Sequence, residues 1–135
     1  MKLICLNVWG GKMFNPLVEF IQKASGTTDI FCFQEMLFGS SPGRGPYGTR
    51  ANLSAEIEKA LPDFDVYRYF APRGSTFHRE LPNPNLRVGL SIVVKKTMEV
   101  VLEGGFPTFP EESVAGKDPN ISITGNFQYV RIRHN

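Results

Sequence analysis

Two short apolar runs near the start of the chain, separated by one amphipathic stretch, constrain the fold more than any other feature. Residues 2–8 and 29–35 are nearly continuous apolar runs of strand length, which is typical of strands buried on both faces. Between them, Asn15-Pro16 suits the start of a helix, and apolar residues recur at helical spacing as far as Ser25-Gly26. This order predicts a βαβ unit, whose two strands are parallel and adjacent.

The remainder of the chain continues the α/β pattern. A second helix is expected from Leu53 to Leu61, capped by Asn52 and ended by Pro62. Further strands are expected over residues 66–70, 87–95 and 127–133, with residues 98–102 either pairing with the 87–95 strand or continuing it. Three Gly-, Ser- and Pro-rich stretches, at 38–50, 72–85 and 104–125, are predicted loops.

Length and composition indicate one domain and exclude some classes of partner. A chain of 135 residues can bury one sizeable core. Fifteen Lys and Arg residues against thirteen Asp and Glu residues are too balanced for a strongly basic polyanion binder. No run has the length of a secretory or membrane-spanning segment, so a soluble, cytoplasmic protein is expected. Because the last strand ends at His134-Asn135 with no partner after it, the chain is expected to be truncated at its C-terminus.

The two cysteines are expected to be small core residues. Cys5 and Cys32 lie inside the apolar runs without Cys or His neighbours at metal-ligand spacing, so no disulfide is expected. Side chains alternate along a strand, which places Cys5 on the face of Asn7 and Cys32 opposite to Glu35. If Asn7 and Glu35 point the same way, the two cysteines should point in opposite directions.

Asn7 and Glu35 are the candidate metal ligands. They fall at the carboxyl ends of the two parallel strands, the edge at which open α/β sheets bind ligands. An amide oxygen and a carboxylate suit a hard cation such as Mg²⁺, which keeps several waters and meets a phosphate. The alternative for Glu35 is a solvated strand end, and for Asn7 a turn residue that bonds its own backbone. Trp9, close by, is a candidate for substrate stacking, against the alternative of core or loop packing.

Arginines crowd the middle of the chain. They are Arg44, Arg50, Arg68, Arg73, Arg79 and Arg87. Guanidinium groups can bind phosphate in a forked geometry, but the favoured interpretation is that these side chains are solvated loop residues.

Several of these residues carry a resemblance to a known family. The stretch Leu3-Ile4-Cys5-Leu6-Asn7-Val8-Trp9-Gly10-Gly11, followed by Asp29-Ile30-Phe31-Cys32-Phe33-Gln34-Glu35, resembles the opening of the endonuclease/exonuclease/phosphatase superfamily. A Gly-led strand over 88–94 and an amphipathic strand over 128–132 are also similar to that family. The resemblance implies that Asn7 and Glu35 help to bind a catalytic Mg²⁺ or Mn²⁺, with Gln34 beside them.

The chain also departs from that family's pattern. No residues here are assigned to the family's catalytic His, Asp-x-Asn motif or terminal Asp-His pair, and His78 and His134 match no family position. The catalytic residues are therefore unknown, and the general base is missing.

The resulting expectation is an α/β fold: a mixed β-sheet with flanking helices, about half of a four-layer α/β/β/α sandwich, with an exposed hydrophobic inner face. Residues 1–135 would form the N-terminal portion of one such domain. The expected function is a metal-dependent phosphoesterase, incomplete in this chain, with nucleic acid or phospholipid head groups among the open substrates. The alternative is a catalytically silent fragment or binding module in which Asn7 and Glu35 only close a turn.

Overall fold

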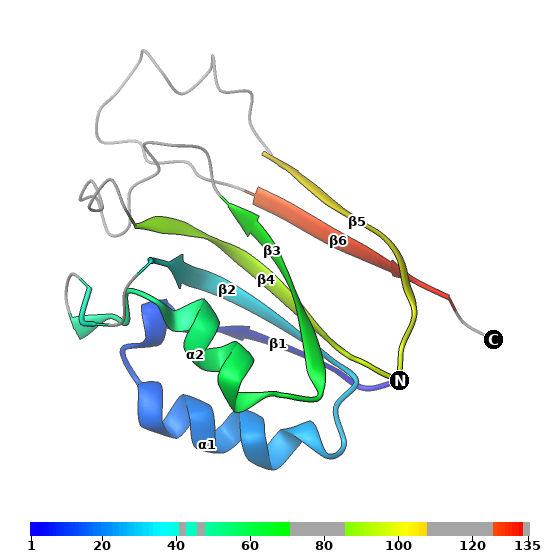
Figure 1. Cartoon of the computed structure of the whole chain (residues 1–135), viewed down its shortest axis with the longest axis horizontal. Coiled ribbons are helices and arrows are strands. Elements are labelled where there is room, and N and C mark those ends of the chain that lie inside the picture. Colours follow the sequence, from blue (N-terminus) through cyan, green and yellow to red (C-terminus); the bar gives the residue numbers. More distant parts are fainter. Residues whose placement is uncertain (41–42, 46–47, 71–85, 108–125, 134–135) are drawn as a thin grey trace.

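The computed structural model describes residues 1–40, 43–45, 48–70, 86–107 and 126–133. Nine elements follow one another in this part of the chain (Figure 1): β1 (Leu3–Asn7), the 3-10 turn η1 (Trp9–Gly11), α1 (Phe14–Ser25), β2 (Ile30–Phe38), α2 (Leu53–Ala60), β3 (Phe64–Phe70), β4 (Arg87–Lys95), β5 (Val100–Pro107) and β6 (Asn126–Ile132). The expected loop over 72–85, most of the one over 104–125, and both histidines lie outside the described residues.

A four-stranded mixed sheet forms the centre of the molecule. Its strand order is β1-β2-β4-β3. Strands β1 and β2 are parallel, with Asn7 opposite Gln34, whereas β4 is antiparallel to both β2 and β3. The predicted βαβ unit is therefore confirmed, because helix α1 carries the chain back so that β2 runs in the same direction as β1.

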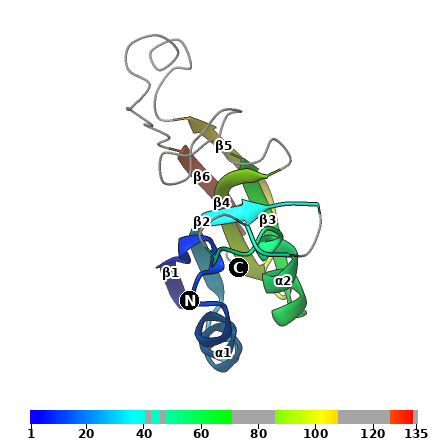
Figure 2. The same cartoon turned by 90° about the vertical axis from the view of Figure 1, so that its left-hand side faces the viewer.

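Both helices pack on one face of this sheet and bury the main core. Figures 1 and 2 show α1 and α2 side by side beneath the sheet. Leu17 and Ile21 of α1 and Ile57 of α2 are buried against Phe31 and other sheet residues. Apolar positions three and four residues apart put these side chains on one stripe of each helix, and burial of that stripe stabilises the helices against the sheet.

A separate two-stranded hairpin covers the opposite face. β5 pairs with β6 in antiparallel fashion, so residues 98–102 neither pair with β4 nor continue it, and residues 104–107 are strand instead of loop. The hairpin contacts the sheet through Val130 and Ile132, which pack against Ile92 and Val94 of β4. The inner face that was expected to be exposed is thus partly covered by the chain's own hairpin.

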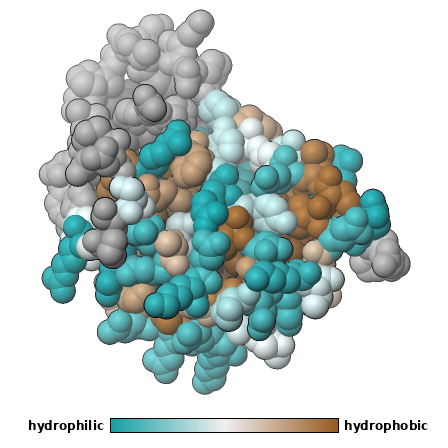
Figure 3. Space-filling model, viewed as in Figure 1, coloured by the Kyte–Doolittle hydropathy of each residue, from teal (hydrophilic) through white to brown (hydrophobic). Residues whose placement is uncertain are grey.

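An exposed apolar area lies on that hairpin. Phe106 and Phe127 are each about half exposed and stack with ring centroids 5.0 Å apart. Val101, Leu102 and Tyr129 are also exposed, and Figure 3 shows a hydrophobic area over β5. None of the helices in the described part of the chain is long and apolar enough to cross a membrane.

The cysteines lie differently from the prediction. Cys5 and Cys32 are register partners on β1 and β2, so their side chains share one face of the sheet, which is the hairpin side because Cys32 packs against Ile92 and Val94. Cys5 is exposed, contrary to the expectation of a core residue, whereas Cys32 is half-buried and packs against the core cluster of Ile30, Ile92 and Val94; both are free thiols. Burial, together with the charge and hydrogen bond of Cys5, raises the pKa of the Cys32 thiol to about 11.

Candidate metal site

A β-bulge in β2 brings Glu35 to Asn7. The β2–β4 pairing shifts by one residue between Phe33 and Met36, and Glu35 has a positive φ of 55°. The extra residue turns the Glu35 side chain toward the face occupied by Asn7, and the Asn7 Nδ2 donates a hydrogen bond of 2.9 Å to the Glu35 Oε1. The predicted meeting of these residues is correct, but the assumption of regular alternation was wrong. Because the bulge lies between Cys32 and Glu35, both of these β2 side chains point to the same face, and the two cysteines can share a face as well.

The chain after Asn7 turns sharply within three residues. Trp9, Gly10 and Gly11 all have positive φ, at 50°, 59° and 75°. The Asn7 Oδ1 accepts a 2.8 Å hydrogen bond from the Trp9 backbone N–H, as turn-forming Asn residues do. The turn interpretation of Asn7 is therefore realised in the structure. An amide oxygen has two lone pairs, so this bond leaves one acceptor position on the Oδ1.

Glu35 holds the most unusual polar atom of the site. Its Oε2 is buried and has no hydrogen-bond partner among the described residues. A buried carboxylate oxygen without a partner is costly, because the desolvation of the charge is not compensated. Such an atom in a folded chain is a reason to look for a missing ligand, a water or a cation.

The other two predicted site residues lie next to this pair. Gln34 is exposed and faces Asn7 in the β1–β2 register, and its backbone oxygen accepts a 3.0 Å hydrogen bond from the Val8 N–H. Trp9 is 49% exposed, and the Lys12 ammonium lies 4.4 Å from its ring centroid. The Trp9 indole is thus a surface group beside the site instead of a core residue.

These side chains fit a hard cation that keeps most of its waters. The donor set consists of one carboxylate and one amide oxygen, which suits Mg²⁺ or Mn²⁺ better than a softer metal. No cluster of three or more His, Cys, Asp or Glu side chains occurs within the described part of the chain. A cation held here would need further ligands besides these two residues, such as water.

An arginine-bearing pocket of about 490 Å³ opens near the far end of β2. It is lined by Phe38 at the end of that strand, by the first turn of α2, and by Arg68, Phe70 and Arg87. Arg68 is paired with Glu58 and hydrogen-bonds Ser54. The Arg87 guanidinium lies over the Phe70 ring at 4.3 Å and has no carboxylate partner among the described residues.

The description of these two arginines as solvated loop residues was wrong. Arg68 and Arg87 belong to strands β3 and β4, not to solvated loops. The strands expected over residues 66–70 and 87–95 already included both arginines, so the two expectations conflicted and the strand prediction is the confirmed one.

Comparison with known proteins gives a clear structural match and no sequence match. No family model matches the chain, and no curated protein matches it. An endonuclease/exonuclease/phosphatase family protein from Leptotrichia buccalis C-1013-b has a similar structure, with a TM-score of 0.52 and 15% identity over 79% of this chain and 42% of the other. The mannosyl-6-phosphatase Bt3783 from Bacteroides thetaiotaomicron VPI-5482 aligns with a TM-score of 0.44 and 15% identity over 78% of this chain and 35% of the other.

The first of these matches defines the class of fold. The chain has part of an endonuclease/exonuclease/phosphatase-like fold, with a mixed α/β arrangement of a four-stranded sheet, a two-stranded sheet and two helices. It spans less than half the length of either structure. Its particular activity does not follow from the fold, because one fold carries many functions.

Proposed function

We propose that this chain carries part of the metal site of a Mg²⁺-dependent hydrolase that cleaves phosphate esters. One observation carries the proposal: the Glu35 Oε2 is buried without a partner while the Oε1 is held by Asn7. A cation bound to this oxygen would remove the cost of the unpaired charge. Mn²⁺ would be accepted by the same oxygen donors.

Each residue then has a definite part in the site. Glu35 and the Asn7 Oδ1 would hold the cation, and the Trp9 N–H would orient the Asn7 amide. The bound cation would supply charge stabilisation to the phosphoryl oxygens. Because Gln34 is exposed beside Asn7, its amide is available to a water or to a substrate oxygen. No residue is assigned as the general base.

The arginine-bearing pocket offers a second place for a phosphate group, on the side of the sheet where α2 packs and apart from Asn7 and Glu35. Arg87 is held over Phe70 and is not neutralised by a carboxylate among the described residues. A guanidinium of this kind offers paired N–H donors to a phosphate. Nucleic acid and phospholipid head groups are both phosphate esters that fit this chemistry.

A specific observation favours a second, catalytically silent role. Asn7 already bonds both Trp9 and Glu35, so the pair would close the turn after β1 without any metal. In that case the side chains serve to stabilise the fold, and added Mg²⁺ has no effect on unfolding.

Thermal unfolding with and without Mg²⁺ separates the two functions. A ligand present at ten times its Kd stabilises the folded state by about 1.4 kcal/mol, which raises the Tm of a domain of this size by roughly 3–5 °C. We expect a shift of this order for the wild-type chain in millimolar Mg²⁺ and none for Glu35→Gln. Without Mg²⁺, Glu35→Gln should unfold at the same temperature or higher, because the substitution removes the unpaired buried charge.

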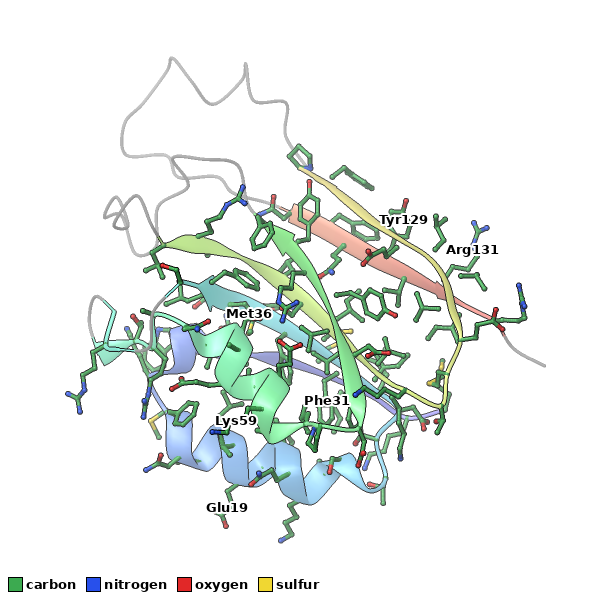
Figure 4. The ribbon with its side chains drawn as sticks, in the orientation of Figure 1. Glu19, Phe31, Met36, Lys59, Tyr129 and Arg131 are labelled. Carbon is green, nitrogen blue, oxygen red and sulfur yellow. The ribbon has the colours of Figure 1, made fainter. Side chains whose placement is uncertain are left out.

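Glu19→Gln is the matched control. Glu19 is exposed on α1 and points away from the sheet (Figure 4), so the same chemical change there should leave the Mg²⁺ shift intact. Absence of a shift in the wild-type chain would reject the metal site and favour the silent role.

A further inference from the structure

The two thiols of this chain form a cross-strand pair. Cys5 and Cys32 are direct register partners on parallel strands, so their side chains leave the same face of the sheet. Neighbouring strands lie about 4.8 Å apart, which is inside the range of Cα separations that a disulfide spans. The two Cα atoms are therefore expected to lie close enough for a disulfide, and the two cysteines are free thiols here.

The members of the pair differ in accessibility. Cys5 is exposed, whereas Cys32 is half-buried. Cys32 lines a pocket of about 660 Å³ between the sheet and the hairpin, together with apolar residues such as Ile30, Met98 and Ile132. A dissolved reagent therefore reaches the Cys5 sulfur first, and Cys32 stands behind it as the second thiol.

The backbone around Cys5 has room to adjust. β1 is an edge strand that pairs only with β2 in the four-stranded sheet. If β1 moves slightly toward β2, no further strand of the sheet has to move with it, because β1 has no neighbour on its outer edge in the described part of the chain. The helix-facing neighbours Ile4 and Leu6 are only partly buried, so they permit such a shift.

We propose that Cys5 and Cys32 are a reversible dithiol–disulfide site that is oxidised by low-molecular-weight disulfides. In the first step the Cys5 sulfur loses its proton to water and attacks one sulfur of the oxidant. A mixed disulfide forms and one small thiolate leaves. In the second step the Cys32 sulfur, after losing its proton to water, attacks the Cys5 sulfur and releases the second thiolate. The protein loses two hydrogens as protons and two electrons, and the oxidant takes up both electrons.

Mass spectrometry after treatment with glutathione disulfide tests this assignment. The wild-type chain should lose the mass of two hydrogens and retain no glutathione. Cys32→Ser should retain one glutathione on Cys5, because the second thiol is missing. Cys5→Ser should gain glutathione on Cys32 about tenfold more slowly than Cys32→Ser gains it on Cys5, because access to the attacking thiol limits the reaction.

Two results would overturn the proposal. One is a wild-type product that keeps one or two glutathione groups, since the thiols would then react separately. The other is a disulfide-linked dimer on a non-reducing gel. The wild-type result alone decides the question, so neither outcome depends on the folding of the variants.

Discussion

The helix-covered face and the hairpin-covered face of the four-stranded sheet are packed to different depths. On the helix side, Phe31, Ile57 and Val93 are completely buried. On the hairpin side, Ile92 and Val94 are buried, but the hairpin residues that meet them are only partly buried. An open pocket of about 660 Å³ lies on this side as well.

The two faces of the sheet therefore contribute differently to the free energy of unfolding. Close packing on the helix side contributes most of the apolar burial that holds the sheet together. The thiol pair Cys5–Cys32 lies on the looser side, where Cys32 lines the open pocket, and the Asn7 side chain shares that face with Cys5. Substitutions on the two faces should therefore have unequal effects on the free energy of unfolding.

The largest effect is expected for Phe31→Ala. The Phe31 ring is fully buried between the sheet and the helices (Figure 4), and it packs 5.6 Å from the rings of both Phe33 and Phe64. Removing it should cost about 3–5 kcal/mol, because apolar contacts are lost and a cavity remains. Denaturant titration followed by circular dichroism measures this cost. Phe20→Ala is the control, since Phe20 is 45% exposed on α1 and should change the unfolding free energy by less than about 1 kcal/mol.

A matched pair of valines on β4 tests the two faces directly. Val93 belongs to the helix-side core and Val94 to the hairpin-side cluster. Val93→Ala should cost about 2 kcal/mol and Val94→Ala about 1 kcal/mol, because the hairpin can move into the space while the helices cannot. Equal losses of unfolding free energy in the two variants would show that the hairpin packs against the sheet as tightly as the helices do.

Alkaline pH should weaken the hairpin side by a smaller amount. Burial, followed by the charge and the hydrogen bond of Cys5, raises the pKa of Cys32 from 9.0 to about 11, and burial also raises the pKa of Tyr67. The folded chain keeps these protons at a pH where the unfolded chain has lost them, so stability falls as pH rises above 9 toward 11.

The size of this loss is limited by solvent. Two pKa units correspond to about 2.7 kcal/mol, but Cys32 is half exposed, and screening should reduce its share below about 1 kcal/mol. Cys32→Ala should flatten the fall in Tm measured between pH 9 and 11. An unchanged slope in that variant would assign the fall to other groups.

The smallest effect on stability is expected on the outer face of the hairpin. Phe127 is 48% exposed and stacks on Phe106, so Phe127→Ser should change the unfolding free energy by no more than about 0.5 kcal/mol. Its effect should appear in self-association, because the exposed apolar area is reduced. Sedimentation velocity at increasing concentration should show less association for the variant, and identical profiles would contradict this.

The sequence was sufficient for the βαβ unit and for the partnership of Asn7 with Glu35. The two apolar runs and the amphipathic helix between them predict two parallel strands, and Asn7 and Glu35 lie at the carboxyl ends of these strands. The bulge was not predictable, because Gln34-Glu35 contains no Gly or Asn to signal a positive φ. The side-chain directions of Cys5 and Cys32 relative to the site were missed for that reason.

The hairpin was missed for a different reason. Gly104-Gly105 resembles a turn, yet both residues lie within β5. A Cβ on Gly104 would approach the Tyr129 hydroxyl to 2.6 Å, and one on Gly105 would approach the Tyr69 ring to 2.4 Å. These glycines make room for aromatic rings from other strands, and such a tertiary requirement leaves no local pattern in the sequence.

The bulge in β2 has a consequence for how this chain can evolve. Deleting one residue from a regular strand turns every later side chain to the opposite face. At Glu35 the strand already holds one residue more than its partner β4, so loss of that single codon would restore regular pairing and leave Phe33 and Met36 in the core. One in-frame deletion could thus remove the carboxylate while preserving the fold, which makes strand length as informative as residue identity when related genes are compared.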